Sequence, residues 1–163
     1  MTDLKTKCIE LLHSRGVEIG DIADCARFLQ APYHKDLKAD VFIPLIDKIL
    51  EKREVQYAIM TGISLDVAAE IDNLDDKTLQ EALLTDKGLY GVDEVIAYGI
   101  CNLYGSIALT NFGYIDKCKY GIIGELNSKG KEDGHCHTFL DDIVGALASA
   151  AASCFAHQWN DHI

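Results

Sequence analysis

Two pairs of adjacent carboxylates are the residues of this sequence whose types and spacing most clearly suggest chemistry. Asp93 and Glu94 stand at the start of one apolar segment, and Asp141 and Asp142 stand at the start of another. Neighbouring carboxylates among apolar residues repel each other and lose hydration unless a positive charge compensates them. Carboxylate oxygens are the ligands that Mg²⁺ prefers, with Mn²⁺ as an alternative. We therefore predict that these four residues bind Mg²⁺ or Mn²⁺, ions that commonly serve phosphate chemistry.

Three further polar residues lie close to these pairs in the sequence. Asp86 precedes the first pair in a glycine-containing segment, and Asp116 and Lys119 follow the apolar segment that the pair opens. Functional side chains commonly lie in loops and at helix ends, so we interpret these three as candidate catalytic residues. Lys119 would offset negative charge on a phosphoryl group, and Asp86 or Asp116 would orient water or complete the metal ligands.

Two other polar groups have more ordinary interpretations. Asp66 and Glu70 are one helical turn apart and could add to the acidic set, but we interpret them as a solvated helix face. His135, Cys136 and His137 are adjacent, and adjacent side chains diverge, so they lack the ligand spacing of a zinc site. For this H-C-H segment we favour a structural or capping role.

Each acidic pair heads a stripe of small residues. The stripes recur at every fourth position, with Asp93, Ala97, Cys101 and Gly105 in the first and Asp141, Gly145, Ser149 and Ser153 in the second. Small residues allow two helices to approach closely, so facing stripes would bring the two acidic pairs together. Ordinary close packing, with acidic residues in a first helical turn that favour the helix dipole, explains the same pattern. The stripes alone leave both interpretations open.

Helical periodicity dominates the chain, with few prolines and no alternating strand pattern. We expect helices over residues 4–12, 19–29, 42–50, 54–71 (as one or two helices), 75–84, 93–110 and 138–157, and a short helix near Ile122. Asp116 and Lys119 are expected in a loop, and residues 127–134 in a polar surface loop. The predicted fold is an all-α, single-domain helical bundle over residues 1–163, with a long central helix surrounded by the others.

Composition narrows the classes of partner. The net charge of −11 argues against nucleic acid and against simple electrostatic binding to an anionic membrane. The longest apolar run, residues 143–156, is shorter than the roughly 20 residues that a membrane span needs. The charged N-terminus and six dispersed cysteines predict a cytoplasmic protein with reduced thiols. The apolar content and the tyrosines suggest a homo-oligomer.

Three motifs in this order resemble the phosphatidylglycerophosphatase A family, especially its small soluble members of the YutG and low-temperature-requirement C type. The resemblance extends over residues 86–150 and rests on Asp86, Gly88, Asp93 and Glu94, then Phe112, Ile115, Asp116 and Lys119, then Asp141, Asp142, Ile143, Val144 and Gly145. Membrane-bound members also carry an N-terminal Gly-Thr-x-Gly-Ser loop and spanning helices, which this sequence lacks. The resemblance implies a magnesium-dependent phosphatase that acts on phosphatidylglycerophosphate or on a related lipid or soluble phosphomonoester.

Two alternative functions belong to other classes. The chain could be a non-catalytic, oligomeric metal- or ligand-binding helical protein that shares only the helix architecture. It could also be an all-α nucleotide pyrophosphohydrolase, which likewise uses helical carboxylates. We rank that enzyme last because its E-E-x-x-E spacing is absent from the sequence.

Overall fold

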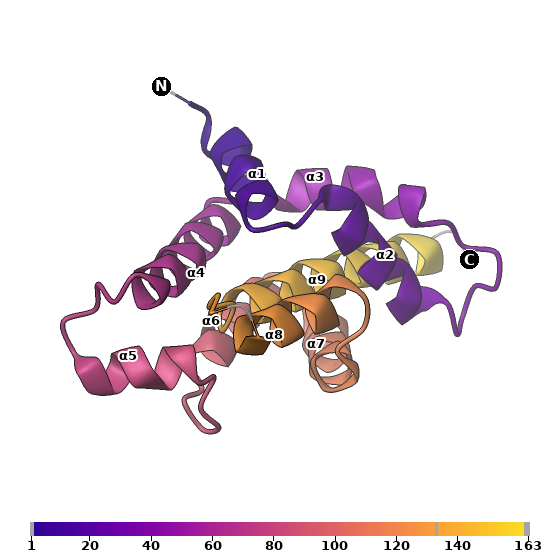
Figure 1. The fold of residues 1–163 in the computed structure, drawn as a ribbon. Helices are drawn as coiled ribbons and strands as arrows, with labels where there is room; N and C mark the ends of the chain where they lie inside the picture. Colours follow the sequence, from indigo (N-terminus) through magenta and orange to yellow (C-terminus); the bar gives the residue numbers. More distant parts are fainter. Residues whose placement is uncertain (1, 133, 162–163) are drawn as a thin grey trace.

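Helices make up the regular structure of the part of the chain that the computed structural model describes, residues 2–132 and 134–161 (Figure 1). The elements are α1 (Leu4–Ser14), α2 (Ile19–Gln30), a 3₁₀ turn η1 (Ala39–Phe42), α3 (Ile43–Ile49), α4 (Arg53–Glu70), α5 (Lys77–Leu84), α6 (Val92–Cys101), α7 (Ser106–Cys118), α8 (Ile122–Glu132) and α9 (Leu140–Asn160). No strand occurs among these residues, so the predicted all-α fold is confirmed. None of the described helices is long and apolar enough to cross a membrane.

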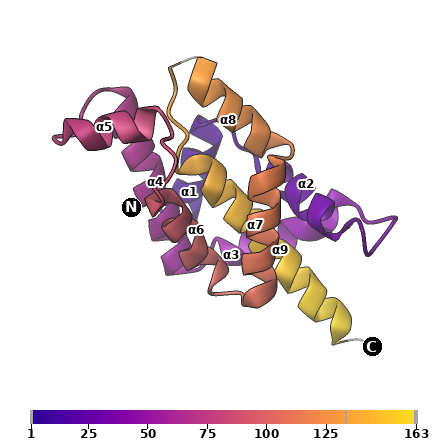
Figure 2. The ribbon, with the colours of Figure 1, turned by 90° about the horizontal axis from the view of Figure 1, so that it is seen from below.

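Helix α9 is the centre of the bundle. Figures 1 and 2 show it passing between the other helices, and it packs against α2, α3, α4, α6, α7 and α8. Every residue from Leu140 to Ser153 is buried. Alanine favours the helix and its small side chain lets neighbouring helices approach from all sides. The predicted long central helix surrounded by others is therefore present.

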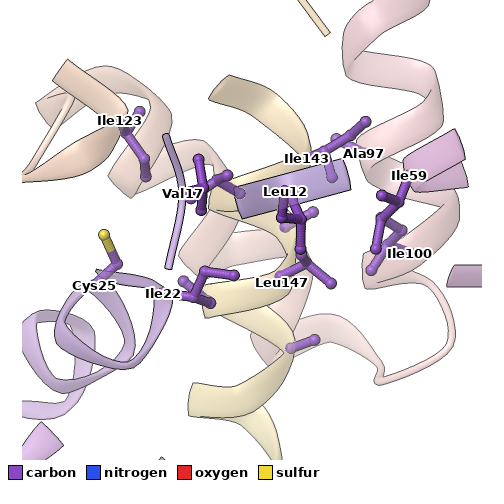
Figure 3. Close-up of a cluster of buried hydrophobic side chains, with 14 of the residues drawn as sticks. Leu12, Val17, Ile22, Cys25, Ile59, Ala97, Ile100, Ile123, Ile143 and Leu147 are labelled. Carbon is purple, nitrogen blue, oxygen red and sulfur yellow. The ribbon is translucent and has the colours of Figure 1, made fainter. Parts of the chain in front are cut away.

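The core forms where the apolar faces of the surrounding helices meet α9. Figure 3 shows Leu12 of α1, Ile22 of α2 and Ile100 of α6 gathered around Ile143 and Leu147 of α9. Each of these side chains is almost completely removed from solvent. Burying an aliphatic side chain of this size stabilises a fold by about 1.5–3 kcal/mol relative to leaving it exposed.

The predicted helix over residues 93–110 is wrong, because the chain turns between α6 and α7. Gly105 has a φ of +92°, a conformation that residues with a side chain rarely adopt. The carbonyl of Tyr104, within the turn, accepts a hydrogen bond of 3.0 Å from the Ser153 hydroxyl of α9. The turn is thereby tied to the central helix, and the stripe of small residues on α6 ends at Cys101.

Two further expectations about loops are corrected. Residues 127–132 continue helix α8, because Ile122, Ile123 and Leu126 anchor its buried face and polar side chains can occupy its outer face. Asp116 lies within helix α7, and Lys119 caps it. The segment predicted as one or two helices is the single helix α4. Within it, Gly62 permits a close crossing with α9, because a side chain there would collide with Ile143.

Candidate metal centre

The N-terminus of α9 carries the two buried carboxylates of the D-D pair. Asp141 and Asp142 lie in the first turn and are only 3 and 4% exposed. Asp116 approaches them from α7. One carboxylate oxygen from each of these three residues lies within 4.8 Å of the other two, an arrangement that could hold a metal ion. We call these three residues the aspartate cluster.

Asp66 of α4 positions the start of α9. Its two carboxylate oxygens accept hydrogen bonds of 3.0 Å from the backbone N–H groups of Phe139 and Leu140. Such N–H groups have no partner within their own helix, so Asp66 acts as a cap from a distant part of the sequence. Burial raises the pKa of Asp66 to about 7, against the opposing effect of these hydrogen bonds. The interpretation of Asp66 as part of a solvated face is wrong, because its side chain is fully buried.

Lys119 joins two members of the aspartate cluster. Its ammonium donates hydrogen bonds to Asp116 Oδ1 at 2.7 Å and to Asp141 Oδ2 at 3.0 Å. The residue ends α7 in the left-handed conformation, with a φ of +51°. Gly124 lets α8 pass close to the backbone carbonyl of Lys119, because a side chain at position 124 would collide with that carbonyl. Although burial opposes it, the carboxylates of Asp141 and Asp116 raise the pKa of Lys119, so it remains protonated.

Negative charge exceeds positive charge in this region. Burial, the charge of Asp141 and a hydrogen bond with Asp93 together raise the pKa of Asp142 to about 11, with burial the largest cause. Burial also raises the pKa of Asp141, although Lys119 partly offsets this effect. Such shifts mean that the ionised carboxylates lack sufficient compensating charge. Hard oxygen donors with an excess of negative charge fit a divalent cation such as Mg²⁺ or Mn²⁺.

The other predicted site residues surround the aspartate cluster. Asp93, in the first turn of α6, is buried and contacts Asp142. Glu94 is next to it and exposed, and its pKa is raised by partial burial and by Asp93 and Asp116. Asp86, in the segment before α6, lines a small cavity together with Asp141. All seven residues thus share one region, but the tightest group contains Asp116, which we interpreted as catalytic, in place of Asp93 and Glu94.

One neighbouring group was missed by the sequence interpretation. Arg15 forms a bidentate ion pair with Glu70, donates to the carbonyl of Cys136 at 2.9 Å and approaches His137 Nδ1 at 3.5 Å. Burial, followed by the charge of Arg15, lowers the pKa of His137 to about 4, so the imidazole is neutral. Glu70 is therefore not a solvated residue. The H-C-H motif signalled the segment, but no spacing in the sequence connects it with Arg15.

The fold and the site define a small all-α protein whose central helix presents a cluster of carboxylates at its N-terminus. The family model of phosphatidylglycerophosphatase A matches residues 12–157, and the chain belongs to this family. It is 52% identical to the uncharacterized protein YutG of Bacillus subtilis (strain 168), over 96% of this chain and 93% of that protein.

Two solved structures support the same relationship. The low temperature requirement C protein from Listeria monocytogenes is 51% identical, with a TM-score of 0.93 over 98% of this chain and 99% of that one. The protein ypjQ from Bacillus subtilis is 46% identical, with a TM-score of 0.93 over 98% of this chain and 97% of that one. The family and the fold that the sequence motifs suggested are thus confirmed.

Proposed function

We propose that this protein is a Mg²⁺-dependent phosphatase that hydrolyses a phosphomonoester, either phosphatidylglycerophosphate or a related lipid or soluble phosphate. The observation that carries the proposal is the aspartate cluster, with three carboxylate oxygens within 4.8 Å of one another at a buried helix N-terminus. Membership of the phosphatidylglycerophosphatase A family supports the same reaction class. Self-association into a homo-oligomer is part of the proposal.

The residues would divide the work according to their positions. Asp116, Asp141 and Asp142 would hold Mg²⁺, with Asp93 and Glu94 at its margin. When bound, the cation supplies positive charge to the phosphoryl group. Lys119, which bonds Asp116 and Asp141, would stabilise charge on the phosphoryl oxygens, and Asp86 would face the substrate from the segment before α6.

A non-catalytic metal-binding protein is the second candidate, and one contact favours it. Lys119 lies between Asp116 and Asp141 and already compensates part of their charge. A network of this kind could be purely structural. Catalysis and structural binding differ in one measurable property, which is turnover of a phosphomonoester.

The test compares wild type with Asp142→Asn for phosphate release. The panel contains phosphatidylglycerophosphate in mixed micelles and soluble phosphomonoesters, each with Mg²⁺, with Mn²⁺ and with EDTA. Asp75→Asn, an identical change at an exposed position before α5, is the matched control. We expect metal-dependent release by wild type and the control, and a loss of at least about 100-fold in Asp142→Asn. Absence of release from every substrate, with Mn²⁺ binding retained, would favour the non-catalytic alternative.

A further inference from the structure

A small cavity adjoins the aspartate cluster. Asp141 belongs to both, and the cavity wall also includes Asp86, Asn127 and His137. Its volume is about 20 Å³. A cavity needs about 10–15 Å³ by this measure to contain one water molecule, so this one accepts a single water and little more.

His137 contributes a hydrogen-bond donor to this cavity. The side chain is 7% exposed, and its Nδ1 faces the guanidinium of Arg15 at 3.5 Å. The positive charge of Arg15 beside Nδ1 disfavours an N–H group at that position, so we assign the proton of the neutral ring to Nε2. His137 lines the cavity together with Asp86 and Asp141. The ion pair with Glu70 and the bond to the Cys136 carbonyl hold Arg15 in place.

The cavity wall therefore offers groups of both kinds. The carboxylates of Asp86 and Asp141 accept hydrogen bonds, and His137 Nε2–H donates one. A water molecule, which donates two and accepts two, complements this set. A phosphate oxygen, which only accepts, would instead meet two carboxylates.

We propose that this cavity holds the hydrolytic water of the phosphatase reaction and that the Nε2–H group of His137 orients it, an inference that rests on the proposed function. The water oxygen keeps a lone pair for phosphorus. Attack forms the bond between water oxygen and phosphorus and breaks the bond between phosphorus and the ester oxygen. One water proton passes to Asp86 and then to solvent. The ester oxygen leaves with its electron pair and takes up a proton from solvent, so that water and phosphomonoester give alcohol and phosphate.

The first test needs no activity. In ¹⁵N-labelled wild type, NMR correlation spectra of the imidazole ring report which nitrogen of His137 is protonated between pH 5.5 and 8. We expect protonated Nε2 and unprotonated Nδ1 throughout this range. A ring protonated at Nδ1, or doubly protonated at pH 6, would overturn the proposal.

The second test compares two substitutions that differ in one donor. His137→Gln places an amide N–H near the position of Nε2, whereas His137→Leu removes the donor but fills similar space. With Mg²⁺ we expect kcat to fall on the order of 10-fold to 100-fold in His137→Leu and by less than about 5-fold in His137→Gln. Mn²⁺ affinity, measured by calorimetry, should stay within about twofold in both. His157→Leu, on the exposed C-terminal part of α9, is the matched control.

The outcomes separate this inference from the proposed function. If His137→Leu retains the wild-type activity, the proposed role of His137 is wrong and the proposed phosphatase function is retained. Loss of the acidic limb of the pH–rate profile in His137→Gln would make His137 a general base and contradict its role as a donor. If the wild-type protein hydrolyses no phosphomonoester, both the phosphatase function and the role of His137 are contradicted. If His137→Leu fails to fold, the glutamine variant and the wild-type NMR spectrum still decide.

Discussion

The ammonium of Lys119 lies 3.0 Å from a carboxylate oxygen of Asp141, although the two residues end and begin different helices. Asp141 is almost completely buried, whereas the Lys119 side chain keeps about a third of its exposure. The lysine therefore supplies positive charge to a group that water scarcely reaches. Removing it leaves the carboxylates without that compensation.

Lys119→Gln should destabilise the metal-free protein. Breaking a fully buried ion pair costs about 3–5 kcal/mol, and the partial exposure of Lys119 lowers our expectation to about 2 kcal/mol. A divalent cation would replace the missing charge. Mn²⁺ at about 5 mM, in excess over the site, should therefore recover most of the lost stability. Thermal unfolding in EDTA and in Mn²⁺ measures both effects. A loss that Mn²⁺ fails to reduce would mean that the cluster does not bind the cation.

Asp142→Asn should stabilise the metal-free protein while it weakens metal binding. The folded state holds the pKa of Asp142 far above its ordinary value, so near neutral pH an ionised Asp142 is penalised only in the folded state. Asparagine removes this penalty and can still donate to Asp93. We expect a gain of about 1–2 kcal/mol, or roughly 3–6 °C in Tm in EDTA. The opposite sign in calorimetric melting curves would show that repulsion at Asp142 is already relieved.

Asp66→Ala should be among the most damaging single changes outside the aspartate cluster. It leaves the buried N–H groups of Phe139 and Leu140 without acceptors, and we expect a loss of about 3 kcal/mol. Asp76→Ala is the matched control, because Asp76 also caps two N–H groups but on the exposed helix α5, where about 1 kcal/mol is expected. Urea unfolding gives both values. Equal losses would show that burial of the cap contributes nothing.

Metal binding should release protons and tighten as pH rises. The pKa values of Asp141 and Asp142 lie above the ordinary carboxyl value, so these groups retain protons that a cation must displace. The same shifts make the metal-free protein lose stability as pH rises above about 4, the ordinary carboxyl pKa, because the unfolded chain ionises first. Calorimetry of Mn²⁺ binding at pH 6, in buffers with different heats of ionisation, should report about one proton released. Affinity that stays constant from pH 5.5 to 8 would contradict this expectation.

The sequence predicted the central helix because its apolar run is long, rich in alanine and headed by two acidic residues. It failed at Gly105, where an apolar periodicity continues through a turn that only backbone geometry and the Ser153 hydrogen bond define. It also failed at residues 127–132, whose polar composition is compatible with either a loop or an exposed helix face.

The candidate site was predictable in its residue types but not in its arrangement. Acidic residues at helix ends were visible in the sequence, yet which carboxylates face each other depends on how α6 and α7 pack on α9. The roles of Asp66 and Arg15 could not be predicted for the same reason. The partners of Asp66 lie 70 or more residues away along the chain. The contacts of Arg15 with the H-C-H segment span 121 or more residues.

The position of α9 along the chain also affects how the protein is made. In the described part of the chain, the six α-helices that pack on it, α2, α3, α4, α6, α7 and α8, all precede it, so each leaves the ribosome before the helix that it packs against. At roughly 5–20 residues per second, the first helices wait roughly 6 to 30 seconds for residues 140–153 to appear. During synthesis the apolar surfaces that α9 covers in the finished fold therefore stay exposed until late, and chaperones can recognise them.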